Sequence, residues 1–236
     1  MSLDLSLDHI PLDPVELNAR FQHHDARDIL VDLLSELEPG KTALTSSFGA
    51  EAAVLLHMVS TIDRDLPVLF LNTEMLFPQT LSYQQQLADF LGLRNVQIIR
   101  PDAGVVAGGD LNVEFARSHP DACCHLRKVK PLERALEPYD AWITGRKRID
   151  GSVRVNMATF EADRSGRLKI NPLSGWSSTK VSDYFETHSL PRHPLVSDGF
   201  KSLGCWPCTS RTTQAQPARE GRWAGSSKTE CGIHFS

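Results

Sequence analysis

The stretch TALTSSFGAEAAVLLHM, residues 42–58, decides the fold class. Its first seven residues, 42–48, are typical of a short strand, Gly49 interrupts them, and residues 50–58 have the composition of a buried helix. A second apolar run, PVLFL at 67–71, indicates a buried strand shortly afterwards. A strand, a helix and a strand in this order favour parallel pairing through a right-handed crossover, so the stretch predicts an α/β fold.

The alternation continues on both sides of this unit. Downstream, the patterns predict a helix over 77–91, a strand over 96–99, helices over 111–117 and about 123–137, strands over 141–144 and 169–173, and a helix over 179–188 capped by Ser178. Upstream, apolar residues at helical spacing over 15–38 predict an N-terminal helical layer. We therefore expect a parallel twisted sheet flanked by helices, with ligands at the carboxyl ends of its strands.

The chain is long enough for one domain, because 236 residues of which 41% are hydrophobic can bury a full core. We expect a single domain over 1–236, with the helical layer in 1–40, the α/β core in 41–200 and a tail in 201–236. From residue 189 onward Pro, Gly, Ser and Thr dominate. Such a tail forms little core by itself, so it is either stapled to the core, mobile, or both.

Charge is unevenly distributed along this acidic chain. The formal net charge of -4 argues against general nucleic-acid binding. Residues 125–154 nevertheless hold eight Lys and Arg against four acids, and residues 201–236 hold five against two. Two basic segments in an acidic protein indicate a local anion pocket, with two solvated surfaces as the alternative reading.

The N-terminus MSLDLSLD has neither the basic nor the apolar region of a signal peptide. No apolar run reaches the roughly 18 residues of a membrane span. We therefore expect a cytoplasmic protein with no membrane partner. The five cysteines are an odd number, and their spacing is unlike a secreted disulfide framework. In a reducing compartment, clustered cysteines favour metal or redox chemistry.

Four of the cysteines form two close pairs. Cys123 and Cys124 lie on an expected helix, and Cys205 and Cys208 form a Cys-x-x-Cys pair in a loop. A tight turn brings the sulfurs of such a pair to one metal. Neighbours on a helix point about 100° apart, which suits two irons of one cuboidal cluster better than one zinc. Structural zinc, a redox pair at 205–208 and ordinary buried cysteines at 123–124 stay open as alternatives.

The fifth cysteine, Cys231, lies near the C-terminus in KTECGIH, residues 228–234. A cysteine on a polar tail followed by glycine is poorly placed for core packing and well placed to move between a pocket and a partner. Lys228 and His234 would favour its reactive thiolate, while Glu230 would oppose it. The alternative is an incidental exposed thiol.

The turn after the first strand, residues 45–51, has small residues that suit anion binding by backbone N–H groups at a helix N-terminus. It lacks the Lys-Ser/Thr ending of a Walker loop, so it is not a standard P-loop. Simple helix capping is the alternative. Candidate cations for the same anion are concentrated near the cysteine motifs: Arg127, Lys128, Lys130, Arg146, Lys147, Arg148, Arg154, Arg219 and Arg222.

Together these motifs resemble the assimilatory adenylyl-sulfate reductases, within the wider phosphoadenylyl-sulfate reductase family. The matching stretches are SSFGAE at 46–51, LNT at 71–73 with LFP at 76–78, CCHLRKVKPL at 123–132, GCWPCT at 204–209, REGRW at 219–223 and ECGIH at 230–234. They extend from about residue 42 to the end. The final motif combined with the two cysteine pairs is highly specific, and it accounts for all five cysteines.

The resemblance implies an adenine-nucleotide alpha-hydrolase-like fold with a nucleotide-binding core. It implies a [4Fe-4S] cluster on Cys123, Cys124, Cys205 and Cys208, and Cys231 as the nucleophile. Further implied residues fall into two groups: catalytic cations at Lys128, Arg219 and Arg222, and substrate contacts at Ser46, Ser47, Phe48, Gly49, Asn72, Thr73, Arg146 and Arg148. The chain departs from the family pattern at Asn72, Glu74, Gln79 and 147–150, which leaves the ribose and phosphate contacts open.

The reaction that the resemblance implies is the reduction of adenosine 5'-phosphosulfate to sulfite and AMP through an S-sulfocysteine, in assimilatory sulfate reduction. The expected donor is thioredoxin or a glutaredoxin-like protein. Two alternatives remain: a reductase for the 3'-phosphorylated substrate, and a zinc-containing PP-loop nucleotide-binding protein. We expect no nucleic-acid partner, and both a monomer and a homo-oligomer are compatible with the sequence.

Overall fold

The computed structural model describes residues 13–107, 112–148, 154–213, 215–226 and 228–234. Asp150 and residues 1–12 of the expected helical layer therefore lie outside the described residues. No helix in the described part of the chain is both long and apolar enough to cross a membrane.

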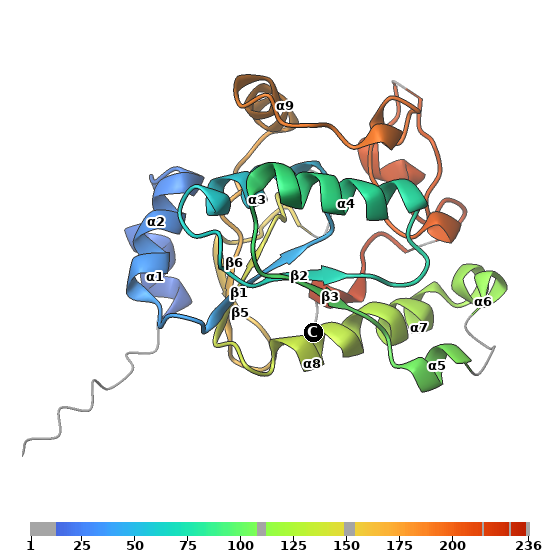
Figure 1. The fold of residues 1–236 in the computed structure, drawn as a ribbon, viewed down its shortest axis with the longest axis horizontal. Coiled ribbons are helices and arrows are strands. Elements are labelled where there is room, and N and C mark those ends of the chain that lie inside the picture. Colours follow the sequence, from blue (N-terminus) through green and yellow to red (C-terminus); the bar gives the residue numbers. More distant parts are fainter. Residues whose placement is uncertain (1–12, 108–111, 149–153, 214, 227, 235–236) are drawn as a thin grey trace, which may run out of the picture.

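The centre of the fold is a six-stranded sheet with the strand order β3-β2-β1-β4-β6-β5 (Figure 1). The strands are β1 (Thr42–Ser46), β2 (Val68–Leu71), β3 (Val96–Ile99), β4 (Ala141–Thr144), β5 (Phe160–Ala162) and β6 (Leu168–Ile170). Every pairing is parallel except that of β5 with β6. This arrangement confirms the predicted parallel sheet and adds an antiparallel edge strand.

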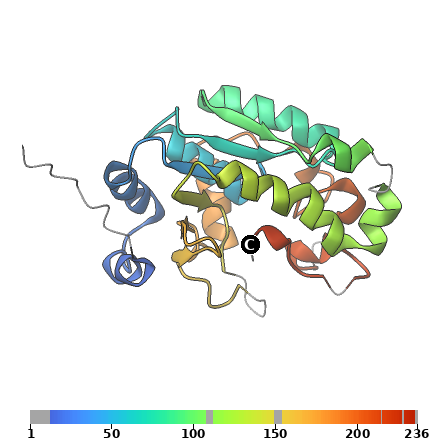
Figure 2. The ribbon, with the colours of Figure 1, turned by 90° about the horizontal axis from the view of Figure 1, so that it is seen from below.

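Helices cover both faces of the sheet, as Figure 2 shows from a second direction. They are α1 (Pro14–Arg20), α2 (Ala26–Glu36), α3 (Ala50–Ser60), α4 (Pro78–Leu91), α5 (Ala103–Ala107), α6 (Val113–Ser118), α7 (Pro120–Cys124), α8 (Lys130–Leu136) and α9 (Ser178–Thr187). Short helical turns are η1 (His125–Val129), η2 (Pro194–Val196), η3 (Trp206–Cys208), η4 (Ala218–Gly221) and η5 (Gly232–His234).

Alternate residues of the central strands supply two separate cores, because successive side chains of a strand point to opposite faces. Leu44 and Phe70 pack into the larger core with α2, α3, α4 and α9. Their neighbours Ala43 and Leu69 pack into the smaller core with Leu132 of α8. Burial on both faces explains why these strands are apolar runs without alternation.

Three of the predicted helices also differ from those observed. The N-terminal layer contains two helices, since Asp13 and Asp25 each cap a new start through the side chain. The helix predicted over 123–137 is interrupted by the π-helical turn η1. Helix α9 is capped by Ser177, whose side chain accepts the N–H of Lys180, instead of by Ser178.

Candidate active site

A cleft of about 910 Å³ opens at the carboxyl ends of β1, β2 and β4. This is the position at which open parallel sheets bind ligands, and the volume is within the usual range of small-molecule sites. Residues from the first strand–helix turn, the end of β4 and the C-terminal tail line the cleft. Of the sequence candidates, it brings together Ser46, Ser47, Gly49, Thr73, Lys128, Arg146, Arg148, Arg219, Arg222 and Cys231.

The turn between β1 and α3 has the shape of an anion-binding loop. Phe48 adopts a left-handed φ of 52°, and its backbone N–H donates to Ser46 Oγ at 3.1 Å. Gly49 is the N-cap of α3 without a side-chain cap, so no side chain satisfies the first N–H groups of the helix. The Phe48 side chain itself is fully buried against Phe70 and does not line the cleft. Only its backbone is available for the predicted substrate contact.

The loop after β2 separates the two residues predicted there. Thr73 lines the cleft, and its hydroxyl lies 3.1 Å from Cys205 Sγ. Asn72 is not among the lining residues, because its side-chain oxygen accepts the backbone N–H of Glu74 at 3.0 Å. Glu74 has a left-handed φ of 58° at this turn. The structure therefore does not place Asn72 where it was expected to contact substrate.

Two arginines enter the cleft from the loop after β4. Arg146 is buried, lies 3.4 Å from the carboxylate of Glu161, and has its pKa lowered by burial and by the nearby Arg154. Arg148 donates from Nε to the carbonyl of Met157 at 2.8 Å. Gly145 precedes them, and a Cβ there would lie 3.2 Å from the backbone nitrogen of Ala52. The missing side chain lets this loop approach the N-terminus of α3 closely.

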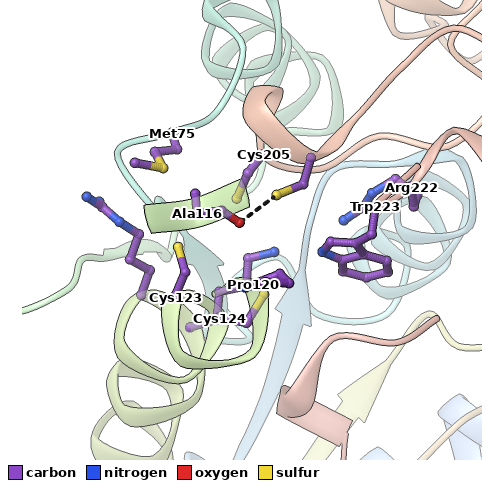
Figure 3. A pocket seen from close by; sticks show the side chains of 11 residues that line it. Met75, Ala116, Pro120, Cys123, Cys124, Cys205, Arg222 and Trp223 are labelled. Atoms are coloured by element: carbon purple, nitrogen blue, oxygen red, sulfur yellow. Dashed lines mark hydrogen bonds between the residues drawn. The ribbon is translucent and has the colours of Figure 1, made fainter. Parts of the chain in front are cut away.

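The four paired cysteines line one small pocket beside the cleft (Figure 3). Cys123 and Cys124 come from α7, while the loop holding Cys205 is joined to Met75 by the N–H of Trp206 at 2.8 Å. In Figure 3 the labelled sulfurs of Cys123, Cys124 and Cys205 point into the same space. Burial raises the pKa of the Cys123 and Cys208 thiols, and the nearby sulfur of Cys205 raises both pKa values further.

Four cysteines lining one pocket are a donor set that both a zinc ion and an iron–sulfur cluster accept. Among the described residues, no three His, Cys, Asp or Glu side chains are grouped to hold one metal ion. Ligands of a tetrahedral zinc would converge on one point with bonds of about 2.3 Å. A cluster takes one thiolate on each of several irons, so its ligands stand around a larger body. The same pocket is lined by Lys128 and Arg222, whose charges suit an anionic cluster.

Cys231 lies between this pocket and the cleft. It shares a hydrogen bond with Cys124, and that bond together with the Lys128 ammonium holds the pKa of Cys231 well below its usual range, although burial opposes them. The same bond and burial raise the pKa of Cys124. Burial disfavours the charge of Lys128, but the sulfurs of Cys205 and Cys231 raise its pKa overall. The arrangement favours a thiolate at Cys231 and a cation beside it.

The two tail arginines are held by the tail's own backbone. Arg222 donates to the carbonyl of Leu203 at 2.7 Å and lies against Gly204, where a Cβ would be 2.3 Å from its guanidinium. A side chain at residue 204 would displace the guanidinium of Arg222 from this position. Burial lowers the pKa of Arg219 to about 10, which keeps it cationic at neutral pH. Both side chains stand next to Trp223, with guanidinium-to-ring distances of 4.5 Å for Arg222 and 5.7 Å for Arg219.

Sequence reasoning missed several residues of the site. Trp223 has a left-handed φ of 52° and lines both the cleft and the cysteine pocket. His193 also lines the cleft and contacts Thr80 Oγ1 from Nε2 at 3.0 Å, and burial lowers its pKa to about 4. Glu230 was interpreted only as opposing the thiolate, but it is buried in an ion pair with Arg154. The REGRW and ECGIH motifs contained two of these residues without indicating their roles.

A family match, a similar sequence and a similar solved structure all belong to reductases of activated sulfate. Residues 41–211 match the phosphoadenosine phosphosulfate reductase domain. The chain is 45% identical over 220 residues to an adenosine 5'-phosphosulfate reductase of Mesorhizobium japonicum, which covers 93% of this chain and 86% of that protein. The solved phosphoadenylyl-sulfate reductase of Candida auris, a phosphate complex, superimposes with a TM-score of 0.71 at 26% identity, covering 87% of this chain and 98% of that one.

A more distant likeness concerns the fold alone. The FMN adenylyltransferase of Candida glabrata, in complex with FMN and an ATP analogue, superimposes with a TM-score of 0.60 at 13% identity. The match covers 86% of this chain and 70% of that one. This likeness agrees with the adenine-nucleotide alpha-hydrolase-like fold that the sequence predicts.

Proposed function

The chain belongs to the phosphoadenosine phosphosulfate reductase domain family, and from that premise we propose that it reduces adenosine 5'-phosphosulfate to sulfite and AMP in sulfate assimilation. The observation that carries the proposal is the position of Cys231, at the boundary of the nucleotide-sized cleft and the four-cysteine pocket. We assign the whole activity to a single domain, in which residues 201–236 supply the nucleophile and part of the cysteine pocket.

The first step is attack of the Cys231 thiolate on the electrophilic sulfur of the substrate. A sulfur–sulfur bond forms, the sulfur–oxygen bond to the AMP phosphate breaks, and its electron pair leaves with AMP. The enzyme then carries an S-sulfocysteine. Negative charge on the sulfonate and on the leaving phosphate requires fixed cations, a role that suits Lys128, Arg219 and Arg222 because all three line the cleft.

The second step needs a dithiol protein, for which thioredoxin or a glutaredoxin-like protein is the proposed donor. One donor thiolate attacks Cys231 Sγ and expels sulfite, leaving a mixed disulfide. The second donor thiol then attacks that disulfide, restores Cys231 and leaves the donor oxidised. Both electrons therefore come from the dithiol. None of the five cysteines is in a disulfide, and the reaction consumes a reduced donor, so we place the enzyme in the cytoplasm.

Cys123, Cys124, Cys205 and Cys208 would hold a [4Fe-4S] cluster. When bound, the cluster supplies a fixed charge distribution and a covalent staple that ties the tail segment of Cys205 and Cys208 to α7. Lys128 and Arg222 line both the cysteine pocket and the cleft, so they hold their charges at the wall that the two spaces share.

Sulfite release under anaerobic conditions tests the proposed function. With reduced thioredoxin, the enzyme should release sulfite and AMP in equal amounts from adenosine 5'-phosphosulfate. The 3'-phosphorylated substrate is a second candidate, because the Candida auris structure is named as a reductase of that compound. The ratio of kcat/KM for the two substrates decides between them. Turnover of ATP without sulfite from either compound would refute the reductase assignment.

Lys128 and Arg222, which line both the cysteine pocket and the cleft, should be needed for turnover but not for binding of iron. Lys128→Ala or Arg222→Ala should lower kcat/KM by roughly two or more orders of magnitude, as does loss of other groups that stabilise transition-state charge. Iron per chain and the visible spectrum should stay as in the wild type. Lys130→Ala, an exposed lysine two residues from Lys128, is the matched control and should behave as wild type. Loss of iron along with activity would make these residues structural.

A further inference from the structure

Glu230 occupies an unusual position for an acidic residue next to a nucleophile. Its side chain is 5% exposed, and one carboxylate oxygen lies 2.5 Å from Arg154 and 3.5 Å from Arg219. Arg154 is also buried, and both arginines line the cleft. A carboxylate shared by two guanidinium groups at low exposure is a strong, directional contact.

The same region holds the backbone on the N-terminal side of Cys231. Arg219 donates from Nη2 to the carbonyl of Thr229 at 2.9 Å, so it binds two successive residues just before the cysteine. Lys228 pairs with Asp121 at the start of α7. On the other side, a Cβ on Gly232 would lie 3.2 Å from Val129, and Ile233 packs on the core of α8. Of these anchors, Glu230 is the buried one that connects directly to cleft arginines.

These contacts impose opposite demands on the two half-reactions. Attack on the substrate requires Cys231 to stay in the cleft, while reaction with a donor protein requires its sulfur to leave it. A contact between Glu230 and Arg154 favours the first of these positions of the tail and opposes the second. Breaking it also changes the charge that the two arginines present to a bound anion, because one carboxylate no longer neutralises them.

We propose that Glu230 is a positioning residue, a latch that holds Cys231 in the cleft for attack and limits the rate at which the tail reaches the donor. The assignment of the two half-reactions rests on the proposed function. The latch itself is a property of the tail, and it also determines how often Cys231 is exposed in the absence of substrate.

Two measurements on anaerobically purified holoenzyme test the latch. Without substrate, Glu230→Gln should increase the rate of Cys231 alkylation by iodoacetamide by about tenfold or more, because a buried ion pair no longer opposes opening. Peptide mass spectrometry separates Cys231 from the other cysteines. In single turnovers, the variant should form the S-sulfocysteine about tenfold or more slowly, yet release sulfite faster when reduced thioredoxin is added to the preformed adduct.

Two further variants make the result specific. Glu36→Gln removes the exposed Arg20–Glu36 pair of the N-terminal layer and should leave all three rates unchanged. Glu230→Asp keeps the charge with a shorter reach, so its rates should fall between those of wild type and Glu230→Gln; it also serves if the Gln variant folds poorly. Unchanged alkylation in both Glu230 variants, or slowing of both half-reactions, would overturn the latch. A wild type that forms no adduct refutes the proposed function, while the alkylation rates still test the latch.

Discussion

Cys231→Ser protein is expected to release no detectable sulfite from adenosine 5'-phosphosulfate, while it keeps the cluster spectrum and substrate affinity of the wild type. We assign the sulfur at this position as the nucleophile, and the Lys128 ammonium beside it favours its thiolate. A serine hydroxyl is far less ionised at neutral pH. A sulfate ester formed there could not be resolved by a thiol at useful speed.

The covalent intermediate makes this prediction measurable without turnover. Wild-type protein mixed with substrate and no reductant should gain one SO3 group, about 80 Da by the stoichiometry of that step. Peptide mapping should locate the added mass on Cys231, and reduced thioredoxin should remove it and yield sulfite. The serine variant should show no added mass. Sulfite release by Cys231→Ser would mean that another group attacks the sulfur, and the proposed mechanism would be wrong.

Cys205→Ser protein is expected to lose iron and activity together. Anaerobically purified wild type should be brown, absorb broadly at about 400 nm and contain about four irons per chain. Cys205 is buried against Thr73 and lines the pocket with Cys123, Cys124 and Cys208, so serine at this position removes one of the four proposed ligands. The same result is expected for serine at Cys123, Cys124 and Cys208. Iron analysis, the visible spectrum and the sulfite assay together measure the effect.

The matched control for this prediction is the fifth cysteine. Cys231→Ser should be as inactive as Cys205→Ser but should remain brown. The Cys231 variant thus loses activity and keeps its iron, whereas the Cys205 variant loses both. Colourless wild-type protein carrying stoichiometric zinc would contradict the cluster assignment. A Cys205→Ser protein that keeps four irons and the wild-type spectrum would remove Cys205 from the ligand set.

The sheet could be predicted from the sequence because its strands are local signals. β1, β2, β3 and β4 are short apolar runs that alternate with helical patterns, and parallel pairing follows from that order. β5 could not be found in this way, since Phe160–Ala162 is only three residues long and pairs with its neighbour in the opposite direction. Its place is determined by tertiary contacts, including that of Asn18 with the backbone of Phe160.

The sequence could indicate which residues are candidates for the site, but it could not predict how their side chains are oriented. Cys231 and the paired cysteines were singled out because their motifs resemble those of the adenylyl-sulfate reductases, whereas their spacing alone left zinc, a redox pair and ordinary thiols open. The direction of Phe48 depends on a single left-handed φ, which sends its ring into the core. Glu230 was misinterpreted because its partner Arg154 is 76 residues away in sequence. Only the folded chain shows that the carboxylate is neutralised by arginines instead of repelling the thiolate.

The π-helical turn η1 determines how α7, which carries Cys123 and Cys124, is rotated about the helix axis relative to α8, which packs in the smaller core. Helix α8 is fixed by Leu132 and Leu136 in the smaller core, and α7 continues from it through His125–Val129. One residue of an α-helix corresponds to a rotation of about 100°, and a π turn accommodates one residue more than an α turn. Shortening η1 by one residue would therefore leave α8 in place and turn both α7 sulfurs away from Cys205. The extra residue sets the direction of the two α7 sulfurs independently of the packing of α8, so the length of η1 is constrained in addition to its Lys128 side chain.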